Sequence, residues 1–434
     1  MRLALLLFAS SVLCIGFSVQ AENITHKCNI KVNQQCASAK SYSEQHFVVE
    51  PGFASKKFCK QASQRIYTLE KNCRYDSYVT AANTAMADYK AKVFAVWGDE
   101  KVSDVHSWVS YSDELNQRSE IDYQTGTIEV SSIGTHNHAD MLKIAEQELN
   151  RVLTLTKSEA EKADPFVSVI IKNTSEKRTS LVETPESKVN EFKLNDSMAA
   201  PKGSNVAKPL MASVMAPVDI DKLVGKAKVV QVSKSETTKK VVPTRTVITV
   251  NFPNDWVYKR AQELKPLFVS TTREWQIEPA LGLAMMFTES SFNPMARSPI
   301  PAYGLMQVVP TSAGLDVNHL IFSKKKSPTP RQLYIEQENL KFGGGYLKLL
   351  RDRYFKKIRD PLSKKYCMIA AYNTGPGNVA KTFTGRVRLQ PAIDEINRLS
   401  PEQVKQRLIT KLPYEETRLY LQKVLKEEQR FSSI

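Results

Sequence analysis

An apolar stretch that ends in a single carboxylate constrains this chain of 434 residues more than any other feature. Glu278 and Pro279 precede an apolar run from Ala280 to Phe287, and Glu289 is the first charged residue after it. Proline suits the first turn of a helix, where no amide proton is needed, and a run without a polar face predicts a buried helix. Burial and the helix dipole would both favour the protonated form of Glu289. The sequence therefore predicts a general acid that works near neutral pH.

The segments that follow Glu289 decide between this reading and a solvated side chain at the end of a core helix, which is where a lone glutamate usually lies. They are Ser290–Pro294 (SSFNP), Ser298, Tyr303–Gln307 (YGLMQ) and Ala371–Gly377 (AYNTGPG). Their order and spacing resemble the catalytic domain of lytic murein transglycosylases of the soluble type, which has a goose-lysozyme-like fold. The resemblance extends from Trp256 to Leu425.

This resemblance implies a non-hydrolytic cleavage of the bond between N-acetylmuramic acid and N-acetylglucosamine in peptidoglycan. Glu289 would protonate the glycosidic oxygen, and the C6 hydroxyl of the same muramic acid would attack C1 to give a 1,6-anhydro sugar. Most glycosidases need two carboxylates, but Glu278 is about three helical turns away and Asp316 lies beyond the Gln307 motif. A one-carboxylate site fits an internal nucleophile, which requires no bound water. No cofactor or metal is expected.

The resemblance also implies roles for the residues around the acid. Gln307 would bind substrate, and Met306 would line the sugar groove. Tyr372 would hold the carboxyl group of Glu289, and Ser298 would bond near it. Alternatives from the residues themselves are a turn for Ser298, core packing for Met306 and Tyr372, and surface polarity for Gln307. The remaining substrate-binding candidates are Asn373, which could instead cap a helix, and Tyr303, which could stack on a sugar.

The N-terminal half predicts a mixed α/β domain that spans residues 22–172. Apolar side chains at helical spacing predict a helix from Tyr78 to Trp97, and another is expected from Ala139 to Leu155. Alternating residues around Gln124-Thr125-Gly126 predict a β-hairpin, and Phe166–Ile171 is expected to be a strand. The scattered residues of this region resemble the N-terminal domain of the membrane-bound lytic murein transglycosylase C family.

The overall prediction is an α+β multidomain chain. Residues 173–252, rich in Ser, Thr, Lys, Glu, Val and Pro, are expected to be a linker or extended segment. Within it, Thr244–Phe252 alternates and predicts a strand that pairs back onto the N-terminal domain. Residues 253–434 are expected to form the mainly α-helical, lysozyme-like catalytic domain, with a short helix at Leu305–Gln307 and close helix packing at Gly343–Gly345.

The first residues predict export from the cytoplasm. Met1–Ala21 has the apolar run and small residues of a cleavable signal peptide, which predicts a periplasmic protein of a Gram-negative envelope. Leu13 before Cys14 argues against a lipid anchor. Four cysteines cluster after the cleavage site, at Cys28, Cys36, Cys59 and Cys73. They favour two disulfides over a zinc site, and the sequence leaves their pairing open.

The net charge of +16 fits an anionic polymer, a membrane surface or a nucleic acid. No nucleic-acid-binding module stands out, and charge alone does not choose among the three. The family resemblance implies peptidoglycan glycan strands as the partner, with peripheral association with the envelope left open. Two alternatives to a lytic transglycosylase remain at this point. One is a hydrolytic muramidase, which would need a positioned water molecule, and the other is an inactive peptidoglycan-binding protein.

Overall fold

The computed structural model describes residue 40 and residues 56–164, 211, 227–232, 243–299, 302–324 and 326–434, with some side chains of the first helix and of one strand left out. The chain divides into two compact units, Met1–Cys73 and Arg74–Ile434. The first described helix, α2 (Lys56–Trp97), belongs to both units and begins well before the predicted Tyr78. The predicted signal peptide, Cys28, Cys36 and the predicted strand Phe166–Ile171 lie outside the described residues. The Cys59 side chain also lies outside the described residues. The two disulfides therefore stay a prediction.

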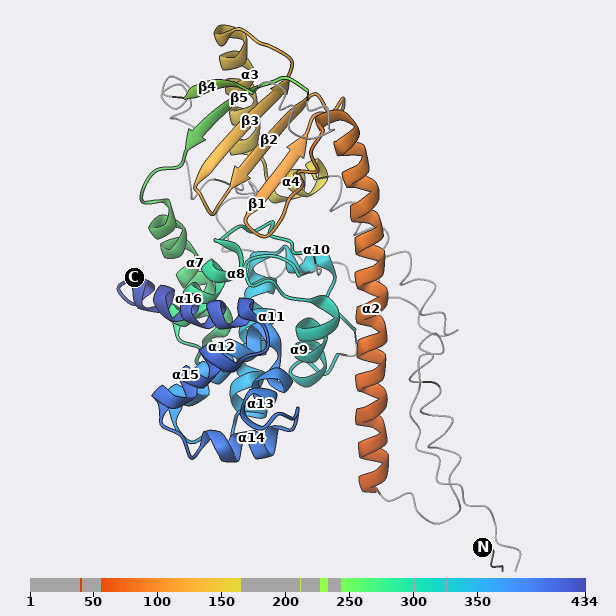
Figure 1. Ribbon diagram of the computed structural model, residues 1–434, viewed down its shortest axis with the longest axis vertical. Coiled ribbons are helices and arrows are strands. Elements are labelled where there is room, and N and C mark those ends of the chain that lie inside the picture. The colour runs from red at the N-terminus through yellow and green to blue at the C-terminus, as the bar shows by residue number, and fades with distance from the viewer. Residues whose placement is uncertain are drawn as a thin grey trace, which may run out of the picture. The chain divides into compact units, whose positions relative to one another are not determined.

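A five-stranded antiparallel sheet forms the first part of the larger unit (Figure 1). Its order is β1-β2-β3-β5-β4. The strands are β1 (Ser107–Tyr111), β2 (Gln117–Asp122), β3 (Thr127–Ile133), β4 (Lys228–Val232) and β5 (Arg245–Asn251). The predicted hairpin is confirmed, since β2 and β3 pair across the turn that contains Gly126.

Two neighbouring strands of this sheet, the inner strand β5 and the edge strand β4, come from the segment that was expected to be a linker or extended chain. β5 pairs with β3, with Val130 opposite Ile248, which confirms the predicted return of Thr244–Phe252 onto the N-terminal region. β4 pairs with β5, so residues 228–232 are a strand of the sheet, whereas the expectation for this segment was a linker or extended chain. Alternation in β4 is short, and a strand of five residues gives little periodic signal.

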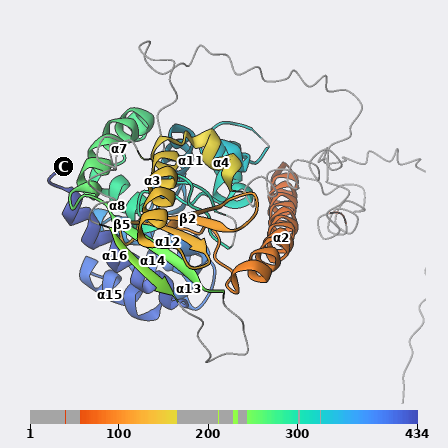
Figure 2. The ribbon, with the colours of Figure 1, turned by 90° about the horizontal axis from the view of Figure 1, so that it is seen from above.

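Two helices accompany the sheet. α3 (His138–Thr154) lies across one face of it, against β3 and β5 (Figure 2), and α4 (Lys157–Ala163) follows. Met141, Ala145 and Leu149 of α3 are buried in the same core as Ile128 of β3 and Ile248 of β5. The predicted helix Ala139–Leu155 is therefore confirmed, and its apolar face is the one that packs on the sheet.

The rest of the larger unit is helical, which confirms the predicted α+β class. Its elements are α7 (Trp256–Thr272), η3 (Arg273–Trp275), α8 (Pro279–Ser290), η4 (Pro310–Gly314), α9 (Leu315–Leu320), α10 (Pro330–Leu333), α11 (Glu336–Leu349), η5 (Leu350–Tyr354), α12 (Pro361–Thr374), α13 (Pro376–Thr384), α14 (Leu389–Ile396), α15 (Pro401–Lys411) and α16 (Glu415–Phe431). In the described part of the chain, no helix combines the length and apolar character that a membrane span needs.

The apolar helix α8 lies beside α16 and packs against α7 (Figure 1). Close contact with α7 requires a glycine at position 282, because a Cβ atom there would lie 2.3 Å from the Phe268 ring of α7. The glycine run of α11 works in the same way. A Cβ atom at Gly343 would meet Met306 at 2.3 Å, and one at Gly344 would meet Thr272 at 2.6 Å, which supports the predicted close packing there.

Gly282→Ala is expected to destabilise the fold by about 1–3 kcal/mol, because the added methyl group overlaps a buried ring. Gly377→Ala in α13 is the matched control, since the nearest atom to its Cβ lies 3.7 Å away and alanine favours a helix by up to about 1 kcal/mol. Denaturant unfolding measures both. Equal stability of the Gly282 variant and the parent would contradict the packing described here.

Candidate functional site

The helix that carries the candidate acid follows the predicted pattern. Glu278 is the N-cap of α8 and Pro279 its first residue, and the apolar residues from Leu281 to Met286 are buried. The helix ends at Ser290, and Ser291 caps it with a left-handed backbone, φ 50°. Phe292 is left-handed as well, with φ 63°. Two successive non-glycine residues in this region cost about 1–3 kcal/mol each, so the chain reversal after Glu289 is strained.

Glu289 keeps part of its surface exposed while its carboxyl group is enclosed by α8 and α16. Its Oε1 atom accepts a hydrogen bond of 2.6 Å from the Tyr420 hydroxyl. Burial raises the pKa of Glu289 to about 8, the Tyr420 hydrogen bond opposes this rise, and the negative charge of Glu416 adds to it. At neutral pH the carboxyl group therefore holds its proton, in agreement with the prediction, and it is accessible enough to give the proton away.

A tight turn holds the glutamine of the second motif. Tyr303 and Val308 exchange backbone hydrogen bonds of 3.2 and 3.1 Å, and between them Gly304 and Gln307 have positive φ. The predicted helix Leu305–Gln307 was therefore wrong, since the bridge closes the segment before a helix can form. The Ser290 hydroxyl lies 2.9 Å from the Leu305 carbonyl oxygen, which joins this turn to the end of α8.

Asn339 of α11 fixes this turn from the other side. Its Oδ1 accepts a hydrogen bond from the Met306 amide at 2.7 Å, and its Nδ2 donates to the Tyr303 carbonyl oxygen at 2.7 Å. The Tyr372 hydroxyl donates to the Met306 carbonyl oxygen at 2.8 Å. The backbone of the turn is thus held by two helices, α11 and α12.

Gln307 emerges from this turn with one side-chain atom unused. Its Nε2 donates to the Gly304 carbonyl oxygen at 3.0 Å. The Oε1 atom is buried and has no hydrogen-bond partner within the described ranges. A buried acceptor without a donor is costly, and a substrate donor would satisfy it.

Tyr372 lies near the acid but does not hold its carboxyl group. Its hydroxyl is used by the Met306 carbonyl, and its ring packs edge-on against Tyr346. Burial and the charge of Glu289 raise the pKa of Tyr372 well above its ordinary value. The contact predicted for it is made by Tyr420, because α16 brings this hydroxyl directly to Oε1.

Two other predicted substrate contacts are buried in the core. The Tyr303 side chain is 1% exposed, and its ring packs edge-on against Tyr334, so it offers no face to a sugar. Met306 is fully buried, with its side chain against Gly343. Both residues shape the turn from inside, and the core-packing alternative is the correct one for Met306.

The last two predicted residues lie on loops and helix ends. Ser298 accepts a hydrogen bond at its Oγ from the Ala302 amide, 3.1 Å away, which is the turn-shaping alternative. Asn373 is exposed near the end of α12, and its Oδ1 accepts a 2.6 Å hydrogen bond from the buried Thr417 of α16. Gly375, rather than Asn373, caps this helix.

Sequence reasoning missed four residues of this site, namely Tyr420, Thr417, Glu416 and Asn339. The first three lie on α16, far along the chain from Glu289 and beyond the segments on which the predicted site was based. A tyrosine, a threonine and a glutamate at helical spacing on one element were the available signal. Glu416 is a second carboxylate whose charge acts on Glu289, although no acid at a nearby position in the sequence pointed to one.

Glu289→Gln is expected to become more stable relative to the parent as the pH rises. Below pH 4.5 the parent carboxyl is protonated in both the folded and the unfolded chain. Between pH 4.5 and about 8 only the unfolded chain releases the proton, so the parent loses about 1.4 kcal/mol of stability per pH unit. The neutral amide has no such loss. Unfolding free energies across this range measure the difference.

The neighbouring variant Thr288→Val is the control for altered local packing, because it removes a buried hydroxyl without a partner among the described residues and no titrating group. Its stability difference from the parent is expected to be the same at every pH. A flat difference for Glu289→Gln as well would contradict the raised pKa.

Comparisons with known proteins match both halves of the chain. The family model described as transglycosylase SLT domain matches residues 266–392. The model described as the N-terminal domain of membrane-bound lytic murein transglycosylase C matches residues 73–179. Among solved structures, the 70 kDa soluble lytic transglycosylase SLT70 from Escherichia coli is similar over 42% of this chain and 28% of its own, with 23% identity and a TM-score of 0.31.

Curated relatives match either most of the chain or somewhat less than half of it. The membrane-bound lytic murein transglycosylase C of Actinobacillus pleuropneumoniae serotype 5b is 30% identical over 351 residues, which are 78% of this chain and 84% of that protein. The protein of the same name from Pectobacterium atrosepticum is 42% identical over 178 residues, 41% of this chain and 49% of that protein. With its two domain matches and these relatives, the chain belongs to the membrane-bound lytic murein transglycosylase C family of lytic transglycosylases.

Proposed function

We propose that this lytic transglycosylase cuts the β-1,4 bond between N-acetylmuramic acid and N-acetylglucosamine without water, leaving a 1,6-anhydromuramic acid end. The enclosed carboxyl group of Glu289, hydrogen-bonded to Tyr420, is the observation that carries the proposal, because burial raises its pKa to about 8 and so provides an acid at neutral pH. Glu289 donates this proton to the glycosidic oxygen as the C1–oxygen bond breaks. The C6 hydroxyl of the same muramic acid then bonds to C1 and returns a proton to Glu289.

The surroundings of Glu289 support both halves of this cycle. Burial favours the neutral acid before cleavage, whereas the Tyr420 hydrogen bond stabilises the carboxylate that forms during it. The substrate supplies its own nucleophile, so the step gains from proximity without a bound water molecule. Gln307 offers its Oε1 atom, which has no partner among the described residues, to a sugar N–H or hydroxyl group, and the exposed Asn373 offers a second polar contact.

Glycan strands of peptidoglycan are the proposed substrate, and the cell envelope is the proposed location. The relatives are named membrane-bound, which agrees with an envelope protein. Export by the signal peptide Met1–Ala21 and the absence of a lipid on Cys14 remain our proposals from the sequence. The positive net charge favours an anionic polymer at this location.

Purified sacculi digested with the enzyme are expected to yield muropeptides that are one water lighter than hydrolytic products, as mass spectrometry would show. Glu289→Gln keeps the shape of the side chain but has no proton to give, so cleavage should fall by about a hundredfold or more while binding to sacculi persists. Release of anhydro products by this variant would overturn the assignment of the acid.

Products of full, hydrated mass would instead favour a muramidase that uses Glu416 as its second carboxylate. This alternative has one observation behind it, the effect of the Glu416 charge on Glu289. Retained binding without any product from the parent enzyme would point to an inactive peptidoglycan-binding protein.

Tyr420→Phe is expected to shift the alkaline limb of the activity–pH profile upward. The Tyr420 hydrogen bond lowers the pKa of Glu289, so its loss leaves the proton more firmly held. The rate should also fall, because the carboxylate formed during cleavage loses its donor. Tyr414→Phe, at the exposed N-cap of the same helix, is the control and should leave the profile in place. An unchanged limb for Tyr420→Phe would show that this hydroxyl does not act on the acid.

A further inference from the structure

A loop that leads into the sheet is bonded to the chain reversal that follows the catalytic helix. We call residues 103–107 the β1 loop and residues 291–297 the reversal segment. The two segments lie antiparallel, and four hydrogen bonds join them. They are Arg297 Nη2 to the Ser103 carbonyl at 2.7 Å, the Arg297 amide to the Asp104 carbonyl at 3.1 Å, Asn293 Nδ2 to the Val105 carbonyl at 3.3 Å, and Ser291 Oγ with His106 Nδ1 at 3.1 Å.

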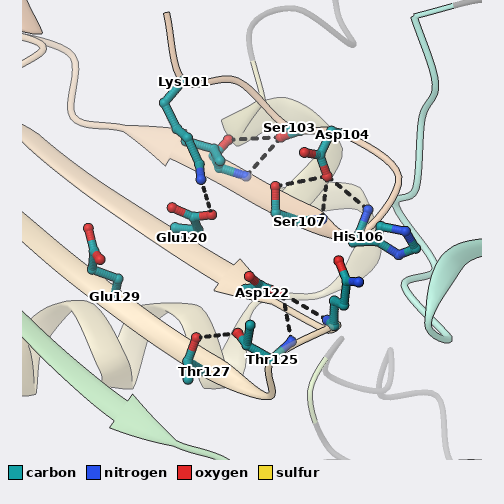
Figure 3. A network of polar contacts seen from close by, with 12 residues as sticks. Lys101, Ser103, Asp104, His106, Ser107, Glu120, Asp122, Thr125, Thr127 and Glu129 are labelled. Carbon is teal, nitrogen blue, oxygen red and sulfur yellow. Dashed lines mark hydrogen bonds and ion pairs between the residues drawn. The ribbon is translucent and has the colours of Figure 1, made fainter. Parts of the chain in front are cut away.

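The β1 loop is held in place by its own hydrogen bonds. Figure 3 shows the carboxylate of Asp104 inside it, where one oxygen accepts hydrogen bonds from the amides of His106 and Ser107 at 2.8 and 2.7 Å and from the Ser107 hydroxyl at 3.0 Å. Ser103 accepts a further hydrogen bond of 2.8 Å from the Val109 amide. The loop is therefore fastened to β1 on both sides of His106.

The reversal segment needs such a support. Ser291 and Phe292 both have left-handed backbones, which residues with side chains adopt only when their surroundings enforce it. Ser291 is the C-cap of α8 and stands two residues after Glu289. Any relaxation of its backbone would turn the last residues of α8, and the carboxyl group with them.

His106 is the one residue of the β1 loop that reaches the cap through its side chain. Its ring is half-buried, and burial lowers the pKa of the imidazole, with Asp104 and Asp122 opposing this and Lys423 of α16 adding to it. A neutral imidazole nitrogen therefore faces the Ser291 hydroxyl. Lys423 lies one turn beyond Tyr420 on the helix that holds the carboxyl group.

We infer that His106 is a positioning residue for the lytic reaction, which holds the Ser291 cap so that the Glu289 carboxyl group stays against Tyr420 and out of water. This gives the N-terminal region a task in catalysis, with no contact to substrate required of it. The inference rests on the proposed role of Glu289. It predicts that loosening the cap changes the turnover rate rather than substrate binding.

The test compares His106→Ala with His106→Asn, whose amide has a polar atom at the place of Nδ1. His106→Ala is expected to lower kcat on purified glycan strands by about tenfold, since small misplacements of a reacting group cost this much or more, with KM unchanged. Its alkaline limb should move to lower pH, because water reaching the carboxyl group removes the burial that raises the pKa of Glu289. His106→Asn should restore most of the rate.

Lys101→Gln is the matched control in the same region. It removes an ion pair with Glu120 of β2, shown in Figure 3, and leaves the bonds to the reversal segment in place. A loss of kcat in this variant equal to that in His106→Ala would reduce the effect to general loosening of the sheet and overturn the inference.

Ser291→Ala covers the case in which His106→Ala folds poorly. It removes the other partner of the same hydrogen bond, and the double variant should lose no more activity than either single one, because both act through one contact. Additive losses would overturn the inference. If Glu289→Gln is inactive while both His106 variants match the parent, only the positioning role falls, whereas an active Glu289→Gln removes the proposed function itself.

Discussion

The hydrogen bond between Tyr420 and Glu289 is the interaction on which the site depends. It places a carboxyl group at the end of an apolar helix and against a second helix, where burial alone would make a charge very costly. One donor at 2.6 Å limits that cost without removing it, so the acid keeps its proton at neutral pH and can still become a carboxylate. The packing of α8 against α16 keeps the two side chains within reach of each other.

The second half of the site is built from backbone rather than from reactive side chains. Asn339, Tyr372 and Ser290 all bind carbonyl or amide groups of the turn that presents Gln307. The glycines of α11 let this helix approach Met306 closely enough for Asn339 to reach it. Under the function proposed above, this scaffold would hold Gln307 in place for the substrate, as a precise site requires.

The sequence was most informative where chemistry and local pattern coincide. The apolar run before Glu289, the first-turn proline and the hairpin around Gly126 each carry their own physical signal, and the structure contains all three. Tyr420 and Glu416 could not be found in this way, since their proximity to Glu289 exists only after α16 packs on α8. Tyr303 and Met306 were predicted to contact substrate because they belong to the Tyr303–Gln307 motif. The closed turn formed by this motif directs both side chains into the core.

The protonation of Glu289 in the folded enzyme is the central claim, and carboxyl-carbon NMR of glutamate-labelled protein tests it directly. The resonance absent from Glu289→Gln identifies the residue, and its shift is followed against pH. A titration midpoint near pH 8 is the predicted result. A midpoint close to 4.5, the ordinary value for glutamate, would show a charged side chain at neutral pH and would contradict the mechanism.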